Sequence, residues 1–235
     1  MNGKDTVMLP RNEDKKNILR LARRYLSQQM EMGFEYGYGL PSRGLTETAG
    51  QRMEALYEQI KDCAECPLHR TRKRFVFGEG HPEADLIFVG EAPGKQEDLQ
   101  GRPFVGPAGQ LLTKMLAAID VNREEVFIGN ILKCRPPQNR DPLPEEVRCC
   151  EPHLQAQLAI LQPVIICALG RIAAQTLLRT KSPLGRLRGS IHRYGDIPLL
   201  ATYHPAALLR NPHFKRSAWE DLLLLRKEYD RLTMI

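Results

Sequence analysis

The chain has 235 residues, of which 42% are hydrophobic, and its formal net charge is +6. This length supports one substantial buried core with an appendage better than two large domains. The sequence lacks an apolar run of the roughly 18 to 20 residues needed to cross a bilayer, and residues 1–16 lack the apolar segment of a secretory signal. We therefore expect a cytoplasmic protein with no membrane partner. The positive charge slightly favours a polyanionic partner.

The first fifty residues have the composition of an extension. Residues 14–32 place apolar side chains at helical spacing between lysines and arginines, which predicts an amphipathic helix. Residues 33–42 are rich in glycine and resemble a linker. We predict an N-terminal helical extension over residues 1–50 and one globular domain over residues 51–235. The helix could dock on the domain or on a partner, or it could be a solvated extension.

The rest of the chain alternates between strand and helix patterns. Four short apolar runs predict buried strands at residues 86–89, 126–131, 164–169 and 199–203. Helical patterns follow them at residues 108–119, 145–161, 171–178 and 217–232. This alternation predicts an α/β fold in which a parallel sheet carries helices on both faces. In such sheets, ligands bind beyond the carboxyl ends of the strands.

Cysteines provide the strongest chemical pattern. Four of them have the spacing of a metal or cluster ligand set: Cys63, Cys66, Cys134 and Cys150. Four thiolates can hold zinc or an iron–sulfur cluster, and spacing alone does not distinguish the two. Free core thiols or disulfides are the alternative. Cys167 lies inside an apolar run and is interpreted as a packed thiol, and Cys149 is also interpreted as a non-ligand.

The first predicted strand runs into the turn GEAPGKQED at residues 90–98. This turn is one residue too short for a phosphate-binding P-loop, and Gln96 stands where that loop has its magnesium-binding serine or threonine. A GxGxxG fingerprint is also missing. We therefore expect no nucleotide cofactor.

Single residues with chemical potential stand near the other predicted strand ends. Phe104 lies in a Gly/Pro-rich loop, where an aromatic ring could stack on a base or simply fill the loop. Asn130 ends a strand and offers both a donor and an acceptor, although such a residue is more often a turn or cap residue. His204 follows the last strand, and the exposed leucines expected after it are candidate wedges into a duplex.

Together these motifs identify a family. GEAPGxxED, GRPFVGxAGxLL, NxxKCRPPxNR and HPAALL, with the four cysteines, resemble the family 4 uracil-DNA glycosylases from about residue 63 onward. The resemblance implies a three-layer αβα sandwich with a four-stranded parallel sheet and loops joined by a [4Fe-4S] cluster. It also implies a monomeric, monofunctional hydrolase that removes uracil from single- or double-stranded DNA, leaves an abasic site and so initiates base-excision repair.

The resemblance assigns roles to the pocket residues. Gly90 would border the uracil, Phe104 would stack on it, and the Asn130 amide would pair with its N3–H and O4. His204 would lie beside uracil O2 and stabilise the departing anion.

The catalytic carboxylate is assigned by comparison with the family 1 motif GQDPY. Glu91 stands at the glutamine position of that motif and Ala92 at its catalytic aspartate position, so the usual water-activating aspartate is missing. Glu91 is our first candidate to place the water, and Glu97 and Asp98 are weaker candidates. Thymine must be excluded by something other than a tyrosine, because Gly94 occupies the tyrosine position.

DNA engagement is expected from the loop at residues 205–210. Leu208 or Leu209, beside Arg210, would replace the flipped nucleotide. Seven basic residues could contact phosphates: Lys95, Arg102, Lys133, Arg135, Arg140, Arg210 and Lys215. The competing hypotheses are a protein of the same fold that binds or covalently traps uracil or damaged DNA without turnover, and a zinc-containing nucleic-acid adaptor.

Overall fold

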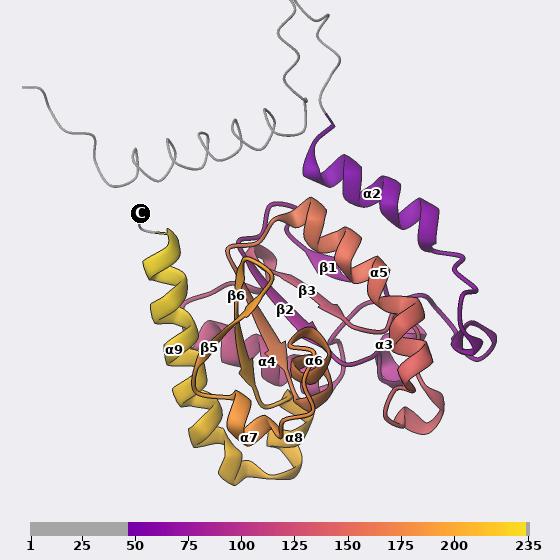
Figure 1. Ribbon diagram of the computed structural model, residues 1–235. Helices are drawn as coiled ribbons and strands as arrows, with labels where there is room; N and C mark the ends of the chain where they lie inside the picture. The colour runs from indigo at the N-terminus through magenta and orange to yellow at the C-terminus, as the bar shows by residue number, and fades with distance from the viewer. Residues whose placement is uncertain (1–46, 234–235) are drawn as a thin grey trace, which may run out of the picture. The chain divides into compact units, whose positions relative to one another are not determined.

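The computed structural model describes residues 47–233, and residues 47–229 form one compact unit (Figure 1). The helix predicted at residues 14–32 and its linker lie outside the described residues. The first described helix, α2 (Ala49–Ile60), starts two residues before the predicted domain boundary. Thr48 and Gln51 form a capping box at its N-terminus, which fixes where the helix begins.

A six-stranded sheet forms the centre, in the order β1-β3-β2-β4-β6-β5. Its strands are β1 (Glu79–Gly80), β2 (Leu86–Gly90), β3 (Phe127–Asn130), β4 (Ile165–Leu169), β5 (Ile191–Tyr194) and β6 (Ile197–Thr202). The four predicted strands, β2, β3, β4 and β6, are parallel neighbours, as expected. The prediction missed the two antiparallel edge strands, because β1 has only two residues and β5 is not apolar.

Helices connect these strands. They are α3 (Lys95–Gln100), α4 (Pro107–Ala117), α5 (Pro144–Leu161), α6 (Arg171–Leu177), α7 (Leu184–Leu187), α8 (Pro205–Arg210) and α9 (Lys215–Thr233). Short 3-10 turns lie at Pro67–Arg70, Arg123–Glu125, Pro137–Asn139 and Pro212–Phe214. The predicted helices correspond to α4, α5, α6 and α9, and each end agrees within two residues.

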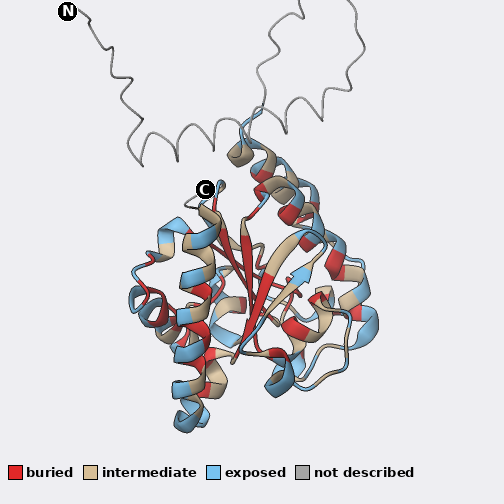
Figure 2. Cartoon of the chain, turned by 60° about the vertical axis from the view of Figure 1, so that its left-hand side comes forward, coloured by how far each residue is buried: buried red, intermediate tan, exposed pale blue. Residues whose placement is uncertain are grey.

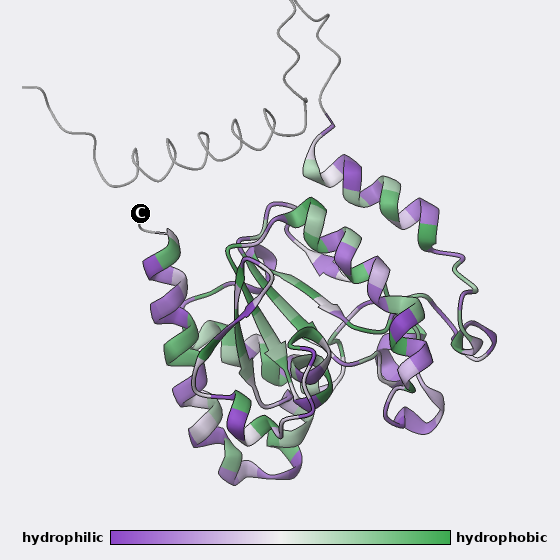
Figure 3. Ribbon diagram, viewed as in Figure 1, coloured by the Kyte–Doolittle hydropathy of each residue, from purple (hydrophilic) through white to green (hydrophobic). Residues whose placement is uncertain are grey.

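The sheet is buried on both faces, as a three-layer αβα sandwich requires. On one face, alternate residues such as Ile87 and Val89 pack in one cluster with Leu154 of α5 and Ala173 of α6. On the other face, Thr202 of β6 donates a hydrogen bond to the Asp221 carboxylate of α9 at 2.7 Å. Figure 2 shows the buried strands between helices whose outer surfaces are exposed, and Figure 3 shows apolar strands beside mixed helices.

Because β3, β2, β4 and β6 are parallel, their carboxyl ends lie along one edge of the sheet. The motifs at residues 90–98, 130–140 and 204–210 all begin at that edge. Within residues 47–233, no helix combines the length and apolar character needed to cross a membrane.

Candidate active site and cysteine cavity

The carboxyl ends of β2 and β3 form one wall of a small pocket. Gly90 and Asn130 are paired neighbours in the parallel register. A Cβ atom added to Gly90 would lie 2.4 Å from Asn130 Oδ1 and 2.6 Å from Phe104 Cζ. Glycine at this position therefore leaves a space between the amide and the aromatic ring. The structure brings these three predicted site residues together.

The loop that carries Phe104 has an unusual and well-supported conformation. Phe104 has a φ of +50°, in the left-handed region that costs energy for a bulky residue. The Glu97 carboxylate accepts hydrogen bonds from the amides of Val105 and Gly106, both at 2.9 Å. Gly109 of α4 is also required, because a Cβ atom there would lie 1.7 Å from the Phe104 carbonyl oxygen. The surrounding structure thus holds the ring in place.

Glu97 and Asp98, the weaker candidates for placing a water, both have structural hydrogen bonds. Glu97 supports the Phe104 loop through its Oε1 atom. Asp98 is buried, and its Oδ1 atom accepts a hydrogen bond from the Lys73 amide at 2.8 Å. Because these two carboxylates already have structural roles, Glu91 remains the better candidate to place the water.

Asn130 has an unpartnered acceptor. The residue is only 2% exposed, and its Oδ1 atom has no hydrogen-bond partner among the described residues. A buried acceptor left unpaired costs about 1 to 3 kcal/mol, so such atoms usually have a reason to exist. A turn or cap role would have used this oxygen. An N–H group of a ligand in the pocket would satisfy it.

His204 is a neutral hydrogen-bond donor. As the N-cap of α8, its Nδ1 atom accepts a hydrogen bond from the Ala206 amide at 3.1 Å, so the ring proton lies on Nε2. Burial and the nearby Arg210 cation lower the pKa of His204 to about 4. Its ring centroid lies 5.4 Å from that of Phe104. Near pH 7 the imidazole therefore offers an N–H group without a positive charge.

Glu91 follows directly after β2 and titrates near neutrality. Burial raises its pKa to about 7, and the Asp141 carboxylate contributes in the same direction, whereas the Arg171 guanidinium opposes both. Asp141 and Arg171 form an ion pair with each other at 2.5 Å. A carboxyl group with such a pKa, at the ligand-binding edge of a parallel sheet, is typical of acid–base chemistry. The Asp141–Arg171 pair was not predicted, because no local sequence pattern indicates it.

The four predicted ligand cysteines line one small cavity of about 10 Å³, which Cys149 also borders. All six cysteines are free, so the disulfide alternative is wrong. Nη1 of Arg72 donates to Cys134 Sγ at 3.2 Å, and Nε2 of His153 lies 3.2 Å from Cys63 Sγ. Cys167 is fully buried in β4, as expected of a packed thiol, and burial raises its pKa.

The predicted insertion loop is a short helix, α8. Leu208 is 2% exposed, because it points into the domain, whereas Leu209 is 47% exposed. Only Leu209 is therefore available to a partner without unpacking. Arg210, at the end of the same helix, is also exposed.

The seven predicted phosphate contacts divide into four groups. Lys133 is completely buried, so its assignment to DNA is wrong. Two arginines already pair with carboxylates, Arg102 with Glu79 and Arg140 with Glu146, each at 2.6 Å. Three residues are exposed cations near the sheet edge or its following helices: Lys95, Arg210 and Lys215. Arg135 is partly exposed and donates to the Asn139 side chain.

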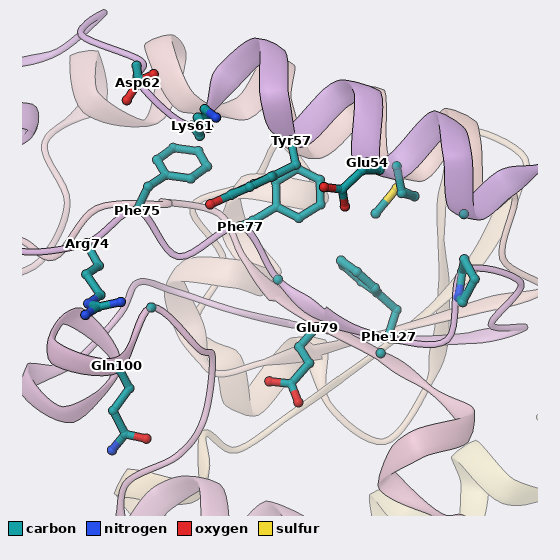
Figure 4. Close-up of a pocket in the computed structure, with 16 residues that line it drawn as sticks. Glu54, Tyr57, Lys61, Asp62, Arg74, Phe75, Phe77, Glu79, Gln100 and Phe127 are labelled. Carbon is teal, nitrogen blue, oxygen red and sulfur yellow. The ribbon is translucent and has the colours of Figure 1, made fainter.

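A separate cleft of about 660 Å³ lies between α2, β1 and the end of α3 (Figure 4). Its lining includes Tyr57 and Phe77, whose rings meet edge to face at 5.4 Å, together with Glu54 and Arg74. No predicted site residue lines it. The chemistry expected from the sequence therefore belongs to the strand ends and not to this cleft.

Comparison with known proteins agrees with this geometry. A family model described as Uracil DNA glycosylase superfamily matches residues 77–223. A type-4 uracil-DNA glycosylase of Pyrobaculum aerophilum is 46% identical over 180 residues, which cover 73% of this chain and 92% of that protein. One from Archaeoglobus fulgidus is 44% identical over 179 residues, covering 73% and 90%, and one from Thermotoga maritima is 43% identical over 179 residues, covering 74% and 93%.

The parallel core, the pocket at its carboxyl edge and the family match define a member of the uracil-DNA glycosylase superfamily. Within this superfamily, the chain is more than 40% identical to several type-4 enzymes over most of their length. The chain belongs to the type-4 uracil-DNA glycosylases.

Proposed function

We propose that this chain is a DNA repair glycosylase that hydrolyses the bond between uracil and deoxyribose and leaves an abasic site. This would initiate base-excision repair. Family membership supports the reaction, and the unpartnered Oδ1 atom of Asn130, buried beside Phe104 and Gly90, is the observation that carries the assignment of the pocket. The expected monomeric state and cytoplasmic location remain predictions.

Recognition depends on the amide of Asn130. Uracil presents an N3–H donor beside its O4 acceptor, so the amide oxygen and nitrogen of Asn130 complement that edge. Cytosine presents an unprotonated N3 beside an amino group, and the Asn130 oxygen would have no donor opposite it at N3. Leaving a buried polar group unpaired costs about 1 to 3 kcal/mol, which corresponds to at least about tenfold discrimination. Stacking on Phe104 adds affinity for the flipped base.

His204 stabilises the departing base. Because Nδ1 is occupied by the Ala206 amide, the neutral ring donates from Nε2, and that donor would face uracil O2. The hydrogen bond strengthens as negative charge accumulates on the leaving uracil, so it stabilises the transition state more than the bound substrate.

Glu91 is the residue that we assign to the sugar and water. As the bond breaks, the deoxyribose develops positive charge, which an ionised carboxylate stabilises. The same carboxylate orients a water and accepts its proton. Since the pKa of Glu91 is about 7, the active carboxylate forms as the pH rises through neutrality.

The cysteine cavity fits an iron–sulfur cluster. Cys63, Cys66, Cys134 and Cys150 supply soft ligands from three separate segments of the chain. Four thiolates could also hold a zinc ion, and it is membership of the type-4 family that favours a cluster here. Thiolates around a cavity suit a cluster, in which separate iron atoms take separate ligands. When bound, a [4Fe-4S] cluster would supply structural stability, and the hydrolysis needs no electron transfer.

DNA engagement is assigned to α8 and the exposed cations. Leu209, which is 47% exposed, is the residue that we propose to enter the duplex where the uracil leaves it. Lys95, Arg210 and Lys215 would contact phosphates, so binding should weaken as salt concentration rises. Leu209→Ala should reduce uracil release from double-stranded DNA more than from single-stranded DNA, because only the duplex needs a replacement for the flipped base.

The test is release of free uracil from a uracil-containing oligonucleotide, followed by alkaline cleavage at the abasic site. Asn130→Ala and Phe104→Ala should each reduce kcat/KM at least tenfold. Asn122→Ala is the matched control, because Asn122 is exposed and only caps a 3-10 turn. Full activity and selectivity of Asn130→Ala would contradict the pocket assignment. Protein that stays bound to the DNA on a denaturing gel would instead indicate the covalently trapping alternative.

A further inference from the structure

Lys133 is a fully buried lysine directly before the ligand cysteine Cys134. Its ammonium donates to the backbone carbonyl oxygen of Asn130 at 3.0 Å and to Oε1 of Gln157 on α5 at 2.6 Å. Burying an ammonium group is costly unless hydrogen bonds and nearby negative charge compensate for it. A lysine in this position therefore needs an explanation other than surface charge.

The geometry of β3 explains why the Asn130 carbonyl needs this donor. The amide of Ile131 donates to Gly90 on β2 at 3.0 Å, so the Asn130 carbonyl in the same peptide group faces away from β2. On that outer side, β1 pairs only with Phe127 and Ile128 and ends before Asn130. The ammonium of Lys133 takes the place that a neighbouring strand would otherwise fill.

The backbone of Lys133 is fixed as well. Its amide donates to Cys150 Sγ at 3.2 Å, and its carbonyl accepts from the Val76 amide at 2.8 Å. Gln157 in turn donates from Nε2 to the Phe77 carbonyl at 2.9 Å. One residue thus joins the end of β3, helix α5, the segment before β1 and a thiol of the cysteine cavity.

We propose that Lys133 is a positioning residue for uracil recognition, which holds the peptide group of Asn130 and links it to the cysteine cavity. This inference rests on the proposed function, because it assigns the Asn130 amide to uracil. Lys133 does not touch the base. It keeps the peptide of Asn130 at an angle that aims the side-chain amide into the pocket.

The first test is Lys133→Met, which keeps a similar length and removes the ammonium. Losing a hydrogen bond from a charged donor should lower kcat/KM for uracil by about 10- to 100-fold. The matched control is Lys114→Met on the exposed face of α4, which should leave kcat/KM unchanged. Iron content and visible absorption of the purified variant report whether the cluster is retained, independently of activity.

A double-mutant cycle separates positioning from general structural damage. If Lys133 acts through Asn130, Lys133→Met should cost no more than about twofold further in an Asn130→Ala background. An equal loss of activity in both backgrounds would overturn the proposal, and so would a Lys133→Met variant with normal kcat/KM. Stabilisation by free uracil gives a second readout: it should raise the melting temperature of wild-type protein and fail to do so in the variant.

Gln157→Leu keeps the inference testable if Lys133→Met does not fold. It removes one acceptor of the ammonium from a different element, and its loss of activity should likewise disappear in the Asn130→Ala background. Additive losses would again contradict the proposal. Wild-type protein that releases no uracil would refute the proposed function itself, whereas active wild-type protein with additive variants refutes only the role of Lys133.

Discussion

Replacing Gly90 by alanine adds one methyl group to the space that we assign to uracil, and so tests that assignment. The new Cβ atom would lie 2.4 Å from Asn130 Oδ1 and 2.6 Å from Phe104 Cζ, whereas ordinary contacts to carbon are about 3.5 to 4.0 Å. Either the amide or the ring must therefore move by about 1 Å, in the space that we assign to uracil. A displacement of about this size near the reacting groups costs on the order of 100-fold in rate.

The assay is uracil release under steady-state conditions, together with thermal unfolding. Gly90→Ala should lower kcat/KM by about 100-fold, and overpacking should cost about 1 to 3 kcal/mol of stability. Gly129→Ala is the control one residue before Asn130: its Cβ atom would meet Phe127 at 3.4 Å and Lys133 Nζ at 3.8 Å, which are tolerable contacts. If Gly90→Ala is as active as Gly129→Ala, uracil does not occupy this space.

Two further predictions concern the catalytic carboxyl and the cysteines. The pKa of Glu91 is about 7, and we have proposed that its carboxylate is the active form, so kcat/KM should rise with pH through about 7. Asp141→Asn should shift this rise to lower pH, and Arg171→Gln should shift it to higher pH. A rise that neither variant moves would exclude Glu91 as the titrating group. Cys134→Ser should abolish the visible absorption of the cluster and lower the melting temperature, whereas Cys167→Ala should keep the absorption. Unchanged absorption in Cys134→Ser would remove that cysteine from the ligand set.

The sequence predicted the parallel core well, because β2 and β4 are continuous apolar runs that only a sheet covered on both faces explains. It also predicted that the candidate site residues would meet at one edge of the sheet, since parallel strands bring their carboxyl ends together there. The edge strands could not be predicted in the same way. β1 consists of two residues, and its pairing with β3 depends on the tertiary arrangement.

The sequence could not predict which of the candidate site residues are buried and which are exposed. Adjacent leucines at 208 and 209 look equivalent in the sequence, and only the packing of α8 against α4 buries the first and exposes the second. Lys133 resembled a DNA contact because it stands in a basic motif, yet its side chain turns inward to Asn130 and Gln157. Asp141 and Arg171 act on the pKa of Glu91, yet they lie 50 residues or more beyond β2 in the chain. No local sequence pattern indicates that the fold brings them close to Glu91.

The most direct measurement of the central claim is the amount of free uracil released per molecule of iron-loaded protein, with uracil-containing DNA in excess. Our account predicts that released uracil exceeds the protein in molar amount and equals the number of abasic sites formed. Release of no uracil, or release that stops at one equivalent with the DNA attached to the protein, would contradict it.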